Sequence, residues 1–330
     1  YLWGNSFGQM QFHFQRSVPI GLRRSNLIML NPKSDTILEE GDEAIVIAED
    51  DSTIHFFEQP VVEPTELSYS ENKVLPNIEK YLIFGWNRKL PILVDEYSGY
   101  IHEGSVIDII VPRKSEAMER IFQQLSSKHP KVRMTLQQVN PSMSNFPAKL
   151  YPHRYDNVII MAGENGTTEE IDSETISMLL KFRHFFREVR NKGEEVHTQL
   201  ITEVMDSANA QIIQQSGVKD FLVSNQFVSK MMAQISEDPD VNLVYEDLFR
   251  EDGSEIYLKP AWLYFDNLPM EVSFADIMLA AQKREEVCFG LKIRSEEYEP
   301  KFGINLIPKK DDVFTLEEGD SLIVLAEDEY

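Results

Sequence analysis

The chain has 330 residues, 42% of them hydrophobic, and a formal net charge of -23. A chain of this length favours two or three lobes over one core, and the acidity argues against a nucleic-acid partner, because phosphate neutralisation needs clustered Lys and Arg. The single cysteine, Cys288, excludes an internal disulfide and fits a reducing compartment, and no apolar run approaches the roughly 20 residues that span a bilayer.

Two stretches near opposite ends of the chain repeat one another. Val18–Asp50 and Val287–Asp328 share V-x-x-G-L-[RK], an identical Leu-Glu-Glu-Gly-Asp and a final alternating apolar segment. Recurrence of one unit this far apart indicates duplication. Each copy is predicted to be a small β-rich module with a hairpin and a tight glycine turn before its last strand. Because the chain begins without an initiator Met, we expect it to be a piece of a longer polypeptide.

The repeated Glu-Glu-Gly-Asp has two interpretations. Glu39, Glu40 and Asp42 are oxygen donors that suit a metal ion. The same residues are typical of a solvated turn in which Gly41 adopts positive φ. We favour the turn.

Between the two copies, a linker rich in Pro, Glu, Ser and Asn (Gln59–Asn77) precedes a series of alternating strands and helices. This alternation predicts a parallel, doubly wound Rossmann-like sheet. The predicted strands are Tyr81–Trp86, Ser105–Val111, Val132–Gln138, Asn157–Met161, Val196–Val204 and Asp220–Ser224. The predicted helices are a segment ending at Tyr97, then Ser115–Ser127, Ser173–Arg190 and Ala208–Ser216.

The first strand, glycine and helix are arranged like the opening of a nucleotide-binding Rossmann unit. The dinucleotide version needs three glycines; Gly85 holds the first place, but Asn87 and Leu90 hold the other two. The second strand runs into Val111 and Pro112 rather than the acid that binds ribose. We therefore predict a vestigial nucleotide loop and no NAD at this half of the protein. The candidate loop residues are Gly85, Trp86, Asn87 and Arg88.

An acidic loop, Gly163–Glu174, follows the fourth strand, at the sheet edge where α/β proteins bind ligands. Its candidate metal ligands are Glu164, Glu170 and Asp172, whose hard oxygens suit calcium. Alternatively, Thr167 or Thr168 caps a helix and the acids complement its dipole, which we favour. No Walker A, G-x-S-x-G or H-E-x-x-H motif is present, so we expect no enzyme.

Two amphipathic helices, Gln226–Ile235 and Val241–Arg250, follow the last strand. Their apolar faces either pack on the same domain or form a dimerisation element. The candidate interface residues are Phe227, Met231, Met232, Ile235 and Leu248. A further short helix around Phe274–Gln282 leads into the second copy of the module.

Together these residues resemble a known family. Leu82–Arg88 (LIFGWNR), Leu222–Met232 (LVSNQFVSKMM), Leu248–Ala261 and the two G-L-[RK]…LEEGD modules are similar, in order, to the CASTOR/POLLUX-type ion channels. That resemblance implies tandem TrkA-like RCK domains (regulators of potassium conductance). It implies residues 1–56 as the C-terminal subdomain of a first RCK domain and 57–77 as linker. Residues 78–225 would then be a Rossmann-like subdomain, 226–252 a helical crossover and 253–330 a second C-terminal subdomain.

The function implied by the resemblance is regulation. The chain would be a non-enzymatic gating-ring module on the cytoplasmic side of a membrane, assembled as a homo-oligomeric (tetrameric or octameric) ring and controlled by a ligand. The pore domain would lie N-terminal to it, and calcium is the candidate ligand. The alternatives are an NAD- or nucleotide-binding regulatory subunit of a separate transporter, or an NAD-dependent enzyme.

Overall fold

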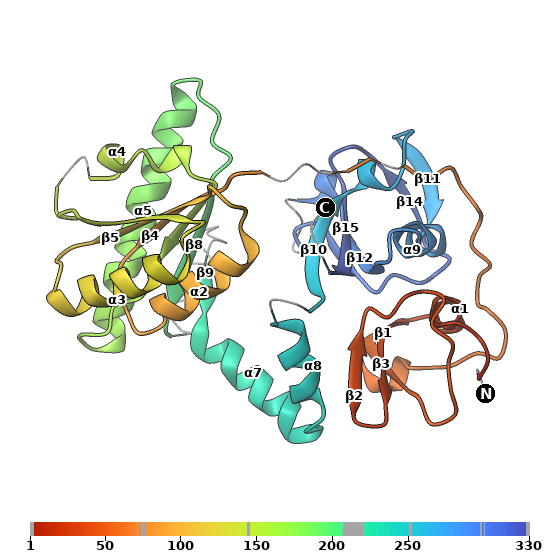
Figure 1. The fold of residues 1–330 in the computed structure, drawn as a ribbon. Coiled ribbons are helices and arrows are strands. Elements are labelled where there is room, and N and C mark those ends of the chain that lie inside the picture. Colours follow the sequence, from red (N-terminus) through yellow and green to blue (C-terminus); the bar gives the residue numbers. More distant parts are fainter. Residues whose placement is uncertain are drawn as a thin grey trace. The chain divides into compact units, whose positions relative to one another are not determined.

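A computed structural model describes residues 3–70, 72–73, 77–143, 146–206, 221–250, 253–297, 299 and 301–327. The chain divides into two compact units (Figure 1). Unit 1 combines Tyr1–Leu75 with Asp238–Tyr330, and unit 2 is Pro76–Glu237. Over the described ranges, no helix is both long and apolar enough for a membrane span.

Unit 2 contains a six-stranded parallel sheet with the order β6-β5-β4-β7-β8-β9. This is the strand order of nucleotide-binding Rossmann folds, so the predicted doubly wound parallel sheet is confirmed. The predicted helix Ala208–Ser216 lies outside the described residues. The strands are β4 (Lys80–Phe84), β5 (Val106–Val111), β6 (Arg133–Gln138), β7 (Asn157–Ile160), β8 (Gln199–Val204) and β9 (Phe221–Val223).

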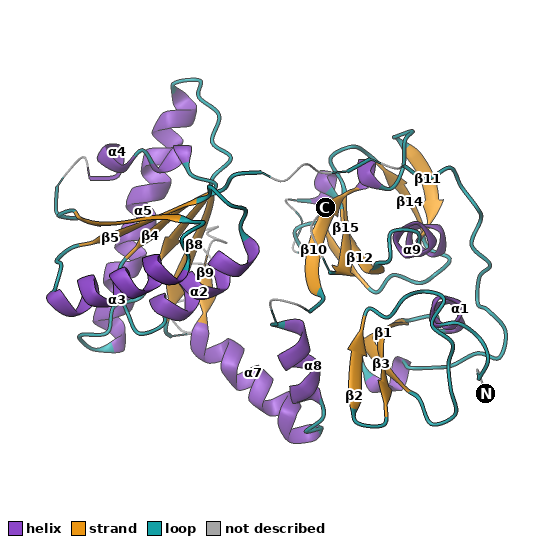
Figure 2. Ribbon diagram, viewed as in Figure 1, coloured by secondary structure: helices purple, strands orange, loops and turns teal. Residues whose placement is uncertain are grey.

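Helices lie on both faces of this sheet (Figure 2). Side chains of β4 alternate between two cores: Leu82 packs with Phe182 of α5, and Ile83 packs with Leu90 of α2. A strand that is buried on both faces has a continuous apolar sequence, and for this reason the apolar run in the sequence predicted β4. The helices are α2 (Leu90–Tyr100), α3 (Glu116–Lys128), α4 (Phe146–Leu150), α5 (Thr168–Asn191) and α7 (Ser224–Glu237).

Unit 1 contains both copies of the repeated module. The first copy has a three-stranded sheet, and the second has a four-stranded and a two-stranded sheet. The first comprises α1 (Phe7–Met10), β1 (Ser17–Arg24), β2 (Leu27–Leu30) and β3 (Glu43–Ala48). The second comprises β10 (Glu255–Pro260), β11 (Met270–Ser273), α9 (Phe274–Gln282), β12 (Val287–Lys292), β13 (Ile304–Leu306), β14 (Val313–Leu316) and β15 (Ser321–Ala326), and α8 (Val241–Leu248) precedes it.

The two copies have matching topology. β1 lies antiparallel between β2 and β3, and β12 lies antiparallel between β13 and β15. A Cβ on Gly21 would lie 2.5 Å from the Met29 carbonyl oxygen, and one on Gly290 would lie 2.8 Å from that of Asn305. The repeated glycine is therefore required by the same close strand approach in both copies. Buried side chains of both copies form one core.

The repeated acidic turn is held by its aspartate. Asp42 Oδ2 accepts the Glu39 N–H at 2.9 Å, and Asp320 Oδ2 accepts the Glu317 N–H at 2.8 Å. Arg24 donates to both oxygens of Asp42, at 2.8 and 2.7 Å, and holds the pKa of that carboxyl below its usual range. The turn interpretation is confirmed, because these oxygens are committed to backbone and guanidinium donors.

Candidate functional site

The loop after β4 lies at the carboxyl edge of the sheet, next to β7, where the strand order reverses. Gly85 adopts φ +105°, and a Cβ there would lie 3.0 Å from the Met161 carbonyl oxygen. Gly85 thus makes the tight turn predicted for the first glycine. Trp86 is half-buried and packs against the core that contains Ile83.

Asn87 stands where the dinucleotide motif has its second glycine, and its side chain is buried. Its Nδ2 donates to the Ala162 carbonyl at 2.9 Å, and its Oδ1 accepts the Lys89 N–H at 2.9 Å. These bonds tie the loop to the end of β7 and to the beginning of α2. In a dinucleotide-binding loop, the backbone at this position approaches the pyrophosphate.

Carboxylates of the chain itself bind the donors at the beginning of α2. Glu164 Oε1 accepts the Arg88 N–H at 2.6 Å, while the Arg88 side chain is exposed. Glu203, from β8, pairs with the Lys89 ammonium and accepts the Ser224 hydroxyl at 2.9 Å. In a nucleotide-binding Rossmann unit, a phosphate would bind to N–H groups and a cation of this kind in place of the carboxylates. Sequence reasoning missed Glu203, because a lone acid within a strand carries no motif.

The three candidate calcium ligands have separate roles. Glu164 binds Arg88 N–H, and Glu170 completes a capping box with Thr167 at the beginning of α5. Asp172 is fully buried, and its two oxygens accept the N–H groups of Met205 at 2.7 Å and Asp206 at 3.0 Å. The predicted helix cap at Thr167 is confirmed, and it makes α5 begin five residues before the predicted Ser173.

Among the described residues, no group of three or more His, Cys, Asp or Glu side chains could hold a metal ion. The structure therefore does not gather Glu164, Glu170 and Asp172 into one cluster, and a calcium site formed by them stays a prediction.

Replacing Asp172 by alanine tests whether this residue is structural. We expect Asp172→Ala to lower the free energy of unfolding of unit 2 by about 2–4 kcal/mol, because two backbone N–H groups at the end of β8 lose their acceptors. Urea denaturation in a Trp3→Phe, Trp262→Phe background, followed by the fluorescence of Trp86, measures this loss, and replacement of the exposed Glu169 by alanine is the control. An unchanged midpoint together with a lost calcium response would assign Asp172 to a metal site instead.

The predicted interface residues divide between the two units. On α7 no side chain is buried; Met232 is 66% and Phe227 is 48% exposed, whereas Met231 and Ile235 are half-buried. Leu248, on α8, instead packs against the core of unit 1. The apolar side chains of α7 are thus exposed or half-buried, whereas Leu248 contributes to the core of its own unit.

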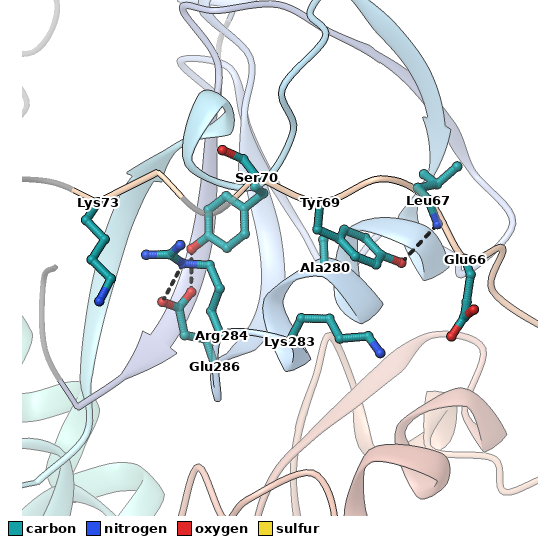
Figure 3. Close-up of a pocket in the computed structure, with 10 residues that line it drawn as sticks. Glu66, Leu67, Tyr69, Ser70, Lys73, Ala280, Lys283, Arg284 and Glu286 are labelled. Atoms are coloured by element: carbon teal, nitrogen blue, oxygen red, sulfur yellow. Dashed lines mark hydrogen bonds and ion pairs between the residues drawn. The ribbon is translucent and has the colours of Figure 1, made fainter.

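A cavity of about 730 Å³ opens in unit 1. One wall is the linker after the first module, with Glu66, Tyr69 and Lys73. The facing wall, immediately after α9, carries Lys283 and Arg284 (Figure 3).

An ion network lies buried at this cavity. Glu286 Oε1 accepts Lys259 Nζ at 2.9 Å, and the two side chains are 4% and 2% exposed. The Tyr264 hydroxyl donates to Glu286 Oε2, and Arg284 Nε lies 3.6 Å from Oε1. Burial and the Glu286 carboxylate raise the pKa of Tyr264, so its phenol stays a donor. Sequence reasoning missed this network because its residues follow no recognisable spacing.

Comparison with known proteins finds one family model and several curated relatives. Residues 1–63 match a model described as "Castor and Pollux, part of voltage-gated ion channel". The relatives include "Ion channel CASTOR" of Lotus japonicus, 26% identical over 89% of this chain and 38% of the relative. "Probable ion channel POLLUX" of Oryza sativa subsp. japonica is 26% identical over 89% of this chain and 33% of the relative. "Ion channel POLLUX" of Lotus japonicus is 25% identical over 89% of this chain and 35% of the relative.

These matches confirm the predicted resemblance to CASTOR/POLLUX-type ion channels. The relatives are named as ion channels rather than enzymes. The chain spans about a third of the length of the relatives it matches.

Proposed function

We propose that this chain, which is similar to the CASTOR and POLLUX ion channels along most of its length, is a cytosolic gating-ring module that controls a cation channel without catalysing a reaction. The observation that carries the proposal is a similarity covering 89% of the chain to proteins named as ion channels. The chain accounts for about a third of those relatives, so in this proposal the pore belongs to another part of the same polypeptide.

Two features of the fold support a regulatory role. In the loop after β4, Glu164 accepts a hydrogen bond from the Arg88 N–H, a group that could otherwise bind a phosphate. The side chain of Asn87 occupies the position of the second glycine. The duplicated module supports a tandem RCK arrangement, in which the first copy ends one RCK domain and the second copy ends the next. We further propose that calcium is the regulating ion, in keeping with the acidic composition.

We propose that the apolar face of α7 is where a second copy of the chain docks. Phe227, Val228 and Met232 are each about half exposed or more, and contiguous exposed apolar side chains mark association surfaces. A ring of RCK domains needs such a surface on every copy.

Met232→Glu is expected to dissociate the oligomer, because it places a charge within the proposed apolar contact around the exposed Met232. Ala233→Glu is the matched control, because Ala233 is exposed on the opposite side of α7. Light scattering after size-exclusion chromatography measures the mass, and circular dichroism checks that the sheet is intact. Equal masses for both variants would refute the assignment of this surface.

Currents through the full-length polypeptide test the function itself. In planar bilayers, we expect calcium on the side of this module to change the open probability, and we expect Met232→Glu to abolish that response while leaving single-channel conductance unchanged. If calcium changes the open probability of neither the wild type nor Met232→Glu, calcium is not the ligand. A polypeptide that carries no current would reject the channel role.

A further inference from the structure

The cavity in unit 1 concentrates positive charge in an otherwise acidic chain. Lys73, Lys283 and Arg284 line it, while the whole chain carries a net charge of -23. The Glu286 carboxylate is balanced by Lys259 at 2.9 Å, which leaves Glu66 as the other acid among the lining residues. The cavity is therefore a locally cationic region of an acidic chain, and its potential favours an anion there.

The donors at this cavity are not all used. Arg284 Nη1 donates to the Asn72 carbonyl at 3.0 Å, so the guanidinium is held in place; its Nε is ion-paired with Glu286 Oε1 at 3.6 Å but has no hydrogen-bond acceptor among the described residues. Within that same part of the chain, neither Lys73 nor Lys283 has an ion-pair partner. A fixed guanidinium and two lysines that line one cavity suit a multiply charged oxyanion.

The rest of the cavity is less polar. Leu67, Tyr69 and Ala280 also line the cavity. Leu67 and Tyr69 belong to the linker, and Ala280 belongs to α9 (Figure 3). Its volume of about 730 Å³ falls within the range of small-molecule sites. This space is larger than an inorganic phosphate needs, and it offers apolar and aromatic surface to an organic group.

We propose that this cavity binds a small organic phosphate, with its phosphate groups on Arg284, Lys283 and Lys73 and its organic part against Tyr69 and Leu67. Because the linker and the end of α9 form opposite walls, such a ligand would fasten the linker to the second module. The inference deepens the proposed regulatory function by naming a second class of ligand. Binding to the isolated chain is independent of any current, so a failure here leaves the channel proposal standing.

The probes are ATP and pyrophosphate, titrated separately into the chain by isothermal calorimetry with EDTA present to remove metal ions. We expect ATP to bind more tightly than pyrophosphate. Lys283→Glu and Lys73→Glu should each weaken ATP binding at least tenfold, because each reverses one charge at the site. Lys301→Glu, an exposed lysine of unit 1 outside the cavity lining, should change it less than twofold.

Circular dichroism of each variant verifies folding, and both lysines of the cavity are exposed, so their substitution is compatible with the fold. Absence of ATP binding at millimolar concentration would overturn the proposal. It would also be overturned if the Lys301→Glu control weakened binding as much as Lys283→Glu, or if pyrophosphate bound as tightly as ATP.

Discussion

Replacing Lys259 by methionine is expected to lower the free energy of unfolding of unit 1 by about 3–5 kcal/mol, because it leaves the Glu286 carboxylate buried without its closest cation. Arg284 Nε lies 3.6 Å from the same carboxylate and does not make up the loss, since Lys259 Nζ lies at 2.9 Å. Both members of the pair are almost completely removed from water, so solvent cannot replace the missing charge.

A double variant separates the charge from the packing. Lys259→Met combined with Glu286→Leu removes both charges, and we expect it to be more stable than Lys259→Met alone, because well-packed apolar groups often replace a buried ion pair at little cost. Lys292→Met, on the exposed side of β12, is the matched control. Urea denaturation in a Trp86→Phe background reports unit 1 through Trp3 and Trp262. A loss below about 1 kcal/mol for Lys259→Met would show that the pair is dispensable.

Stability of unit 1 is expected to rise with pH above about 7 because of Lys310. Lys310 is fully buried, and its Nζ donates to the Ser17 carbonyl of the first module at 2.9 Å and lies 5.5 Å from the centre of the Phe274 ring. Among the described residues no carboxylate pairs with it. Burial therefore lowers the pKa of Lys310 from 10.5 to about 7.

The direction follows from proton binding. Between about pH 7 and 10.5 the unfolded lysine holds a proton that the folded one has released, so a higher pH favours the folded state. Below about pH 7 both forms are charged, and the cost of burying the ammonium is present in full. Relative to Lys310→Met, the wild-type chain should gain about 2 kcal/mol between about pH 7 and 8.5, at 1.36 kcal/mol per pKa unit.

Unfolding free energies of both proteins at these two pH values measure the gain. Burial raises the pKa of the Cys288 thiol to about 12, and because both proteins contain this thiol, its effect on stability cancels in the comparison. Lys309→Met, the exposed neighbour, is the control. Parallel pH profiles for the wild type and Lys310→Met would show that the buried amine keeps its proton throughout.

Local patterns in the sequence determined much of this fold. The short helix predicted around Phe274–Gln282 is confirmed as α9, since Ser273 caps it and its apolar residues repeat at helical spacing. The repeated Leu-Glu-Glu-Gly-Asp located two turns because each aspartate bonds to a backbone N–H only three residues away. Asn87 in place of the second glycine predicted that this loop departs from the dinucleotide pattern, and in the structure the Asn87 side chain is bonded to the Ala162 carbonyl.

The polar sites, in contrast, were decided by the tertiary structure. Lys310 meets a carbonyl 293 residues away, and the cavity brings a linker against the end of α9. Lys259 and Glu286 look like ordinary surface charges in the sequence, yet they are buried together. Hydrophobic periodicity records which face of an element is buried, because burial is repeated at every turn or every second residue. A single buried charge has no period, and its partner is set only when distant elements pack.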